Sequence, residues 1–226
     1  MTPPETAFLF DLDGTLVDSV YDHVLAWHDA MAAEGIELSF WRIHRKIGMS
    51  GGLFTNMLLR ETGGEISEER IARLQRLHTE FYNLRSNVIR PLPGARELLR
   101  FLTGQNVPWA IATSGRMETA GPVLAHLGVD PMVTAVVTRD QVRHAKPDPD
   151  LFIEAANRLG VDIRDSCVVG DSIWDMLAAR RCHSLGIGLL SGGYGEDELL
   201  KAGAYRVFED PADMLKHIDE VGGRRR

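Results

Sequence analysis

The stretch FLFDLDGTL at residues 8–16 joins an apolar run to two aspartates and a glycine. Its beginning, from Ala7 to Phe10, has the length and continuous apolar character of a buried parallel strand. Asp11 and Asp13 follow as this strand ends, and a two-residue spacing in extended backbone points both side chains the same way. Open α/β sheets bind ligands in the crevice at this end of their strands. The alternative is an ordinary turn, because Asp-Gly sequences are common in turns.

Similar apolar runs recur before turns rich in glycine or aspartate. They lie at residues 107–112, 134–137, 167–169 and 185–190. Apolar residues at three- and four-residue spacing predict helices between these runs, over residues 94–102, 118–127, 148–159 and 172–181. Alternating strands and helices predict an α/β fold with a doubly wound, Rossmann-like parallel sheet.

Residues 19–87 break this alternation, because they show helical patterns and no strand pattern. The predicted helices cover residues 19–34, 39–47, 52–62 and 68–87, and glycines at 35, 48 and 63 end the first three of them. The sequence PLPG at residues 91–94 marks the return to the main domain. We therefore predict a Rossmann-like catalytic core of residues 1–17 and 91–226, with a helical cap domain of residues 18–90 that opens and closes over it.

Composition and charge limit the classes of partner. The chain has 226 residues, 44% of them hydrophobic, which suffices for one core and a smaller added domain. Its 25 Lys and Arg against 32 Asp and Glu give a net charge of -7, so no global basic field attracts nucleic acid or anionic membrane. Residues 1–5 lack the order of a signal peptide, and no apolar run reaches membrane-spanning length. We expect a cytoplasmic protein, monomeric or homodimeric, in which Cys167 and Cys182 are buried thiols.

Polar groups also follow other predicted strands. Thr113-Ser114-Gly115 supplies a hydroxyl and exposed amides that suit phosphate oxygens, although a plain helix cap is the alternative. Lys146 precedes a rigid turn, and a solvated surface lysine is its alternative. In the next helix we expect Asp148 at the cap and Pro149 at the first position.

Asp171 and Asp175 complete the set, and their four-residue spacing predicts that both face the same side of a helix's first turn. Helix capping would be a sufficient explanation for Asp171 and Asp175 taken by themselves. It does not explain why four polar sites each follow a strand that a parallel sheet brings to the same edge. A carboxylate can attack phosphorus and leave again, while a second carboxylate transfers the protons. Because carboxylates repel phosphate, a lysine and a hard cation such as Mg²⁺ are needed, with Asp171 and Asp175 as the natural metal side. The pattern predicts phosphoryl transfer.

The chain resembles the haloacid dehalogenase superfamily, specifically its phosphatase-like members with a helical cap inserted after the first strand. DLDGT at 11–15, TSG at 113–115, KP at 146–147 and GDSIWD at 170–175 carry the resemblance. It implies that Asp11 is the nucleophile and Asp13 the acid/base, while Ser114 and Lys146 stabilise the phosphate and the intermediate. It also implies a Mg²⁺ site at Asp11, the backbone carbonyl of Asp13 and Asp171. Asp175 is then expected to support the metal or Lys146.

Several branches of this superfamily resemble the chain. Asp13 argues against the dehalogenases, which lack an aspartate there, and Leu12-Asp13 departs from the Trp-Ala of phosphonatases. Residues 18–27 resemble β-phosphoglucomutase, in which the match to His23 helps to gate the general acid; a histidine packed on a helix face is the alternative. The cap loop IGMSG at 47–51 keeps the mutase's serine as Ser50, but both of its basic positions are uncharged here. We expect His23 and Ser50 among the substrate-binding residues.

The segment LLSGGYG at residues 189–195 is similar to phosphoglycolate phosphatases. We therefore expect a magnesium-dependent phosphatase of a small phosphorylated metabolite, phosphoglycolate-like or a sugar phosphate, acting through an aspartyl-phosphate. A phosphosugar mutase and a non-catalytic phosphometabolite-binding module are the alternatives. The basic run at residues 42–46 is expected either to meet a second anionic group of the substrate or to form a solvated helix face.

Overall fold

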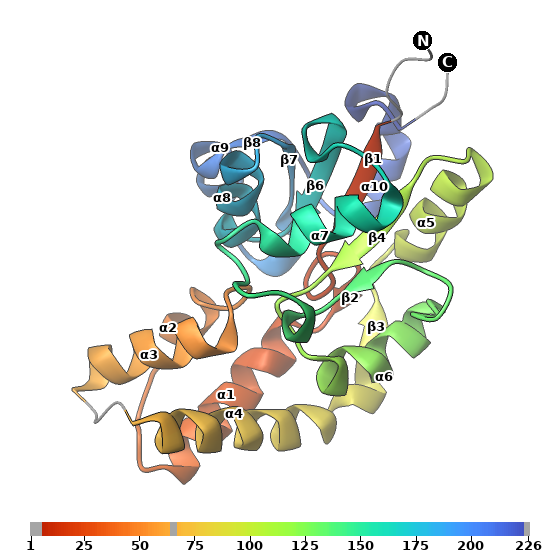
Figure 1. Cartoon of the computed structure of the whole chain (residues 1–226). Helices are drawn as coiled ribbons and strands as arrows, with labels where there is room; N and C mark the ends of the chain where they lie inside the picture. Colours follow the sequence, from red (N-terminus) through yellow and green to blue (C-terminus); the bar gives the residue numbers. More distant parts are fainter. Residues whose placement is uncertain (1–5, 64–66, 224–226) are drawn as a thin grey trace.

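A computed structural model describes residues 6–63 and 67–223. It contains a six-stranded parallel sheet with helices packed on both faces, and a group of helices, α1 to α4, beyond one end of the sheet (Figure 1). The predicted doubly wound α/β fold is confirmed. Residues 1–5 and 224–226 of the predicted core and 64–66 of the predicted cap lie outside the described residues.

The sheet has the strand order β5-β4-β1-β6-β7-β8. Its strands are β1 (Ala7–Phe10), β4 (Trp109–Ala112), β5 (Val136–Val137), β6 (Ser166–Gly170), β7 (Leu185–Leu189) and β8 (Ala204–Phe208). All of these except β8 were predicted, with bounds that differ by a few residues. The edge strand β8 carries Tyr205 and Arg206 exposed to solvent, so it lacks the continuous apolar run of a buried parallel strand.

The helices are α1 (Val20–Ala33), α2 (Phe40–His44), α3 (Gly51–Thr62), α4 (Glu68–Asn83), α5 (Ala95–Gly104), α6 (Met117–Leu127), α7 (Asp150–Leu159), α8 (Ile173–Arg181), α9 (Glu196–Ala202) and α10 (Pro211–Lys216). The prediction for the start of α7 is wrong. Pro149 rather than Asp148 holds the cap position, because the Asp148 carboxylate instead bonds Arg181 Nη1 at 2.9 Å. No helix within 6–63 and 67–223 is both long and apolar enough to cross a bilayer.

Side chains of β1 alternate between two hydrophobic cores, one on each face of the sheet. Phe8 and Phe10 pack with α5, α6 and α10. Leu9 packs on the opposite face with α7 and α8, through side chains such as Phe152 and Ala178. Burial on both faces anchors β1 at the centre of the sheet, and this fixes where the chain after Phe10 emerges.

A two-stranded antiparallel ribbon marks where the chain leaves the sheet and returns to it. It pairs β2 (Val17–Asp18) with β3 (Arg90–Pro91), and the backbone N–H of Leu92 donates to the carbonyl of Leu16 at 2.9 Å. These strands were not predicted, because two residues are too few to show a strand pattern. The ribbon brings the beginning of α1 close to the end of the segment that follows α4.

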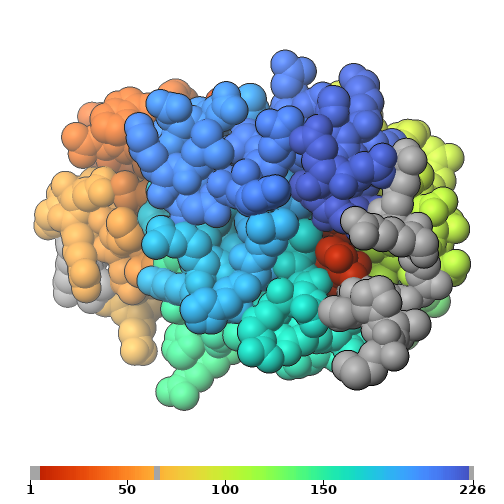
Figure 2. All heavy atoms as spheres, turned by 90° about the horizontal axis from the view of Figure 1, so that it is seen from above, coloured from red at the N-terminus to blue at the C-terminus, as the bar shows by residue number. Residues whose placement is uncertain are grey.

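Helices α1 to α4 enclose a hydrophobic core of their own. Trp27 from α1, Phe54 and Leu58 from α3 and Leu74 from α4 all belong to it. This arrangement agrees with the expected helical insertion, while the domain boundaries at 18 and 90 stay a prediction. Seen from above, the segment around α2 and α3 (orange) lies against the C-terminal part of the chain (blue) (Figure 2). One contact there is the hydrogen bond from the Tyr194 hydroxyl to the Arg45 carbonyl, at 2.8 Å.

Candidate active site

A buried lysine joins two carboxylates at the carboxyl end of the sheet. Lys146 has no exposed surface; its Nζ forms an ion pair with Asp11 Oδ1 and lies 2.8 Å from Asp175 Oδ1. Asp11 follows β1 directly, and its backbone N–H donates to the carbonyl of Val169 in β6 at 2.8 Å. Asp175 Oδ2 accepts hydrogen bonds from the Ser172 amide and hydroxyl, at 3.1 and 2.5 Å. The surface-lysine alternative is wrong, because this ammonium is buried. A lysine is almost never fully buried unless it is paired with an opposite charge.

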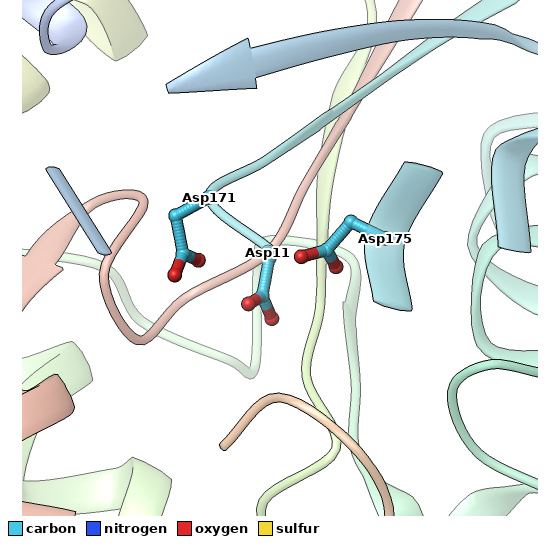
Figure 3. A group of neighbouring side chains, drawn as sticks. All are labelled: Asp11, Asp171 and Asp175. Atoms are coloured by element: carbon cyan, nitrogen blue, oxygen red, sulfur yellow. The ribbon is translucent and has the colours of Figure 1, made fainter. Parts of the chain in front are cut away.

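Asp171 lies on the other side of Asp11 from Asp175 (Figure 3). Its Oδ1 accepts a hydrogen bond from the Thr15 hydroxyl at 3.0 Å. Two glycines make room for Oδ2: a β-carbon at Gly14 would lie 2.6 Å from this oxygen, and one at Gly192 would overlap it. The loop after β1 and the loop after β7 therefore fix the position of this carboxylate together.

The three carboxylates fit a hard divalent cation. Asp11, Asp171 and Asp175 each offer an oxygen, and these oxygens all lie within 4.8 Å of one another. Mg²⁺ is bound by a few carboxylate oxygens together with waters and phosphate oxygens, so a small set of buried carboxylates suits it. Both oxygens of Asp175 have partners, Lys146 at Oδ1 and Ser172 at Oδ2, whereas the polar contacts of Asp11 and Asp171 are made by Oδ1, so Asp11 and Asp171 are the freer ligands.

Burial and like charge perturb this cluster strongly. Burial is the main cause that raises the pKa of Asp11 to about 7; Asp175 and Asp13 raise it further and Lys146 opposes them. Burial, Asp175 and Asp11 likewise raise the pKa of Asp171 well above its usual range. Burial lowers the pKa of Lys146, but the two carboxylates outweigh burial and raise it, so the ammonium stays charged. A cation beside Asp11 and Asp171 would relieve the repulsion that raises both carboxyl pKa values.

The carboxylate of Asp13 turns toward α1 and α4. Its Oδ1 accepts hydrogen bonds from the Ser19 hydroxyl at 2.6 Å and the Tyr82 hydroxyl at 3.4 Å, and lies 3.2 Å from His23 Nε2. Burial alone would raise the pKa of Asp13, but the contacts with His23 and Ser19 outweigh burial and lower it to about 2. Among the described residues, the Asp13 carboxylate does not belong to the group of carboxylates that lie close enough together to hold one metal ion. The expected metal contact through the Asp13 carbonyl stays a prediction.

A stack of rings holds His23 beside Asp13. His23 Nδ1 lies 3.0 Å from His78 Nε2, and the His23 ring packs on Tyr82 with centroids 3.9 Å apart. Burial is the largest cause that lowers the pKa of His78 well below its ordinary value, so His78 is neutral and one ring can donate to the other. His23 is thus both a packed helix-face histidine and a contact of Asp13. Its gating role stays a prediction.

The loop after β4 presents an unsatisfied hydroxyl. Ser114 Oγ is buried and has no hydrogen-bond partner among the described residues. Thr113 Oγ1 accepts from the Gly115 amide at 3.0 Å, which shapes the loop. The plain helix-cap alternative does not hold for Ser114, because α6 has Arg116 at its cap position. A buried hydroxyl without a partner costs free energy unless a ligand satisfies it.

These groups meet at a cavity of about 180 Å³ between the sheet edge and α1 to α4. The predicted site residues on its wall are Asp11, Asp13, His23, Thr113, Ser114 and Gly115. Lys146 and Asp175 lie behind Asp11 in the ion-pair cluster. Ser50 is not on the wall: its hydroxyl accepts from the Leu53 amide at 3.4 Å and caps α3.

Sequence reasoning did not single out several residues that shape the site. Tyr82 and Ser19 hold Asp13, His78 holds His23, and Thr15 holds Asp171. Thr15 lies inside the first motif, where a hydroxyl after two aspartates was a usable signal. Tyr82 and His78 gave no signal beyond helical periodicity, because their contacts depend on how α4 packs beside α1.

Comparisons with known proteins agree with this geometry. Residues 5–183 match the model of the haloacid dehalogenase-like hydrolase family. A phosphoglycolate phosphatase of Agrobacterium fabrum is 32% identical over 94% of this chain and 91% of its own. Hexitol phosphatase A of Escherichia coli is also 32% identical, over 80% of this chain and 82% of its own.

The fold is also similar to that of a solved structure. The crystal structure of a hydrolase from Pseudomonas syringae superposes with a TM-score of 0.94 and 54% identity, covering 96% of this chain and 99% of that one. The resemblance drawn from the sequence motifs is confirmed. This chain belongs to the haloacid dehalogenase-like hydrolase family.

Proposed function

We propose that this enzyme hydrolyses small phosphate monoesters with Mg²⁺, through a phosphorylated Asp11. One observation carries the proposal: the buried cluster of Asp11, Lys146, Asp171 and Asp175 reaches, through Asp11, a cavity whose wall includes Ser114, and the Ser114 hydroxyl has no partner among the described residues. A site that combines carboxylates, a fixed ammonium and a free hydroxyl donor suits a phosphate group bound at a metal.

In the first step, an Asp11 carboxylate oxygen bonds to phosphorus as the bond from phosphorus to the ester oxygen breaks. Asp13 gives a proton to the departing oxygen. In the second step, Asp13 takes a proton from water, the water oxygen bonds to phosphorus, and the bond to Asp11 breaks. Since Asp13 is ionised in the resting enzyme, it must take up a proton as the substrate binds; the negative charge of the bound phosphate favours this by raising the pKa of the neighbouring carboxyl. The proton that Asp13 takes from water in the second step is released with the product.

The remaining residues hold the phosphate and orient the carboxylates. Lys146 neutralises Asp11 and the incoming phosphate, while Ser114, Thr113 and Gly115 offer hydroxyl and amide contacts to its oxygens. Asp175 acts by holding Lys146. We assign His23, which lines the cavity, to the substrate-binding wall, and we leave Ser50 out of it since its hydroxyl caps α3.

Asp11 and Asp171, two of the three grouped carboxylates, would hold the metal together with the Asp13 carbonyl. When bound, Mg²⁺ supplies positive charge that lets a phosphate dianion approach the carboxylates and stabilises charge on its oxygens. Within the protein, Thr15 and the space at Gly192 keep Asp171 aimed at this position.

The named relatives support a small phosphorylated metabolite as substrate, since one is a phosphoglycolate phosphatase and another a hexitol phosphatase. A cavity of about 180 Å³ agrees with a small leaving group. We place the protein in the cytoplasm, without nucleic-acid or membrane partners, in line with its net charge of -7.

A phosphate-release assay tests the proposal. The protein is incubated with a panel of phosphorylated metabolites, with Mg²⁺ or with excess chelator, and inorganic phosphate is measured. We expect release with Mg²⁺ and none with chelator. Isomerisation of a sugar phosphate faster than phosphate release would favour the mutase alternative, and binding without turnover would favour a phosphometabolite-binding module.

A further inference from the structure

Lys46 does not share the environment of the other basic residues around it. Arg42 lies over the Trp41 ring, His44 Nε2 lies 2.8 Å from the Gly192 carbonyl, and Arg45 pairs with Glu198. Lys46 alone among these basic residues lines the cavity, and it is 8% exposed. The expectation of a solvated helix face is therefore wrong for this residue.

Glu61 anchors the Lys46 ammonium without occupying the cavity. Lys46 Nζ lies 2.7 Å from Glu61 Oε1, and Glu61, in the last turn of α3, is not on the cavity wall. A lysine ammonium has three N–H donors. One donor serves Glu61, so two can serve a ligand, and the carboxylate behind the ammonium fixes its position.

The surrounding wall strengthens any contact that this ammonium makes. Trp27, Ile47, Met49 and Phe54 form the neighbouring apolar surface of the cavity. An electrostatic hydrogen bond is stronger in such low-dielectric surroundings than in water. The phosphate-holding loop at residues 113–115 lines the same cavity, so one small molecule can meet both.

Two other cations on the wall are less suited to this task. Arg116 is exposed and its Nη1 lies 2.6 Å from Asp140 Oδ1. Arg139 is only partly buried, and its Nη1 donates to the Val142 carbonyl at 2.8 Å. Lys46 is the most buried of the three, so solvent screens its charge least.

We propose that Lys46 binds a carboxylate on the leaving group of the substrate. The preferred substrates are then short phosphorylated hydroxy acids rather than neutral polyol phosphates. This inference rests on the proposed phosphatase function and narrows its substrate class. The remaining donors of the ammonium would form charge-assisted hydrogen bonds with a carboxylate, and these are stronger than bonds to a neutral hydroxyl.

The test compares two esters of matched size, 2-phosphoglycolate and 2-hydroxyethyl phosphate, which differ by a carboxylate in place of a hydroxymethyl group. With Mg²⁺, the wild-type kcat/KM should favour 2-phosphoglycolate by about 10- to 100-fold, the range expected for a hydrogen bond to a charged group. Lys46→Met should bring this ratio close to one, and Lys46→Arg should largely keep it. Lys201→Met, which removes an exposed lysine of α9, should leave the ratio unchanged.

The ratio of the two esters is independent of the fraction of folded enzyme, and the wild-type ratio requires no variant. A wild type without preference, or a Lys46→Met variant that retains the preference, would overturn the role of Lys46 while leaving the phosphatase proposal intact. Absence of phosphate release from both esters and from every other ester of the panel would instead overturn the proposed function, and this inference with it.

Discussion

His23 Nε2 lies 3.2 Å from Asp13 Oδ1, and the His23 ring is held from behind by His78. This contact is a main reason why the pKa of Asp13 falls to about 2 although burial alone would raise it. The acid/base carboxylate of the proposed mechanism is thus positioned by helices α1 and α4, which also form the far wall of the cavity.

Replacing His23 with Asn should lower kcat about tenfold, because Asp13 loses a positioning contact, while KM changes little. The substitution removes a group that lowers the Asp13 pKa, so this pKa rises toward or above the ordinary 3.8. A carbon NMR titration of the Asp13 carboxyl should show this rise directly. His28→Asn on the same helix is the control; an unmoved Asp13 pKa and a normal kcat in His23→Asn would refute the positioning role.

Replacing Ser114 with Ala should separate binding from stability. Its buried hydroxyl has no partner among the described residues, so removing it should not lower the free energy of unfolding and should raise it by up to about 1 kcal/mol. The kcat/KM for phosphate esters should fall by about 10- to 100-fold, because a contact to charged phosphate is lost. Ser166→Ala is the matched control: its hydroxyl donates to the Asp162 carbonyl at 3.1 Å, so it should lose about 1 kcal/mol of stability and keep its activity. The reverse pattern would contradict the assignment of Ser114.

Replacing Gly192 with Ala should weaken metal binding, although Gly192 lies outside the four motifs at residues 11–15, 113–115, 146–147 and 170–175. The new methyl group would overlap Asp171 Oδ2, so the carboxylate must turn away. We expect the Mg²⁺ concentration for half-maximal activity to rise about tenfold or more, as with other losses of support behind a metal ligand. Gly104→Ala, where a β-carbon meets nothing within 4 Å, should leave the metal requirement unchanged. An unchanged Mg²⁺ requirement in Gly192→Ala would exclude Asp171 as a ligand.

Sequence reasoning located the residues that follow strands directly. Asp11, Ser114 and Asp171 come within two residues of the ends of β1, β4 and β6, and the carboxyl ends of parallel strands share one edge, so the strand pattern and the motifs sufficed. The edge strand β8 was missed because its outward residues are polar and exposed.

Contacts that depend on how the helices pack could not be predicted from the sequence. Tyr82 reaches Asp13 from a residue 69 positions further along the chain, through the packing of α4. Lys46 sits in a run of charge that is typical of a solvated face, but in the structure it is buried, lines the cavity and pairs with Glu61 from the next helix. Such pairings follow from tertiary packing, which periodicity does not encode.

The nucleophile can be tested directly by substitution and by chemical trapping. Asp11→Asn keeps the shape of the side chain but lacks the anionic oxygen that attacks phosphorus, so kcat should fall by at least about 1,000-fold in a protein that still folds. For trapping, the wild type is mixed with Mg²⁺ and a substrate ester, quenched within the first turnover and treated with borohydride, which reduces an acyl phosphate to an alcohol. We expect peptide mass spectrometry to find homoserine at position 11, and only when both the substrate and Mg²⁺ were present. Turnover without any modification at position 11, together with near-normal activity of Asp11→Asn, would contradict it.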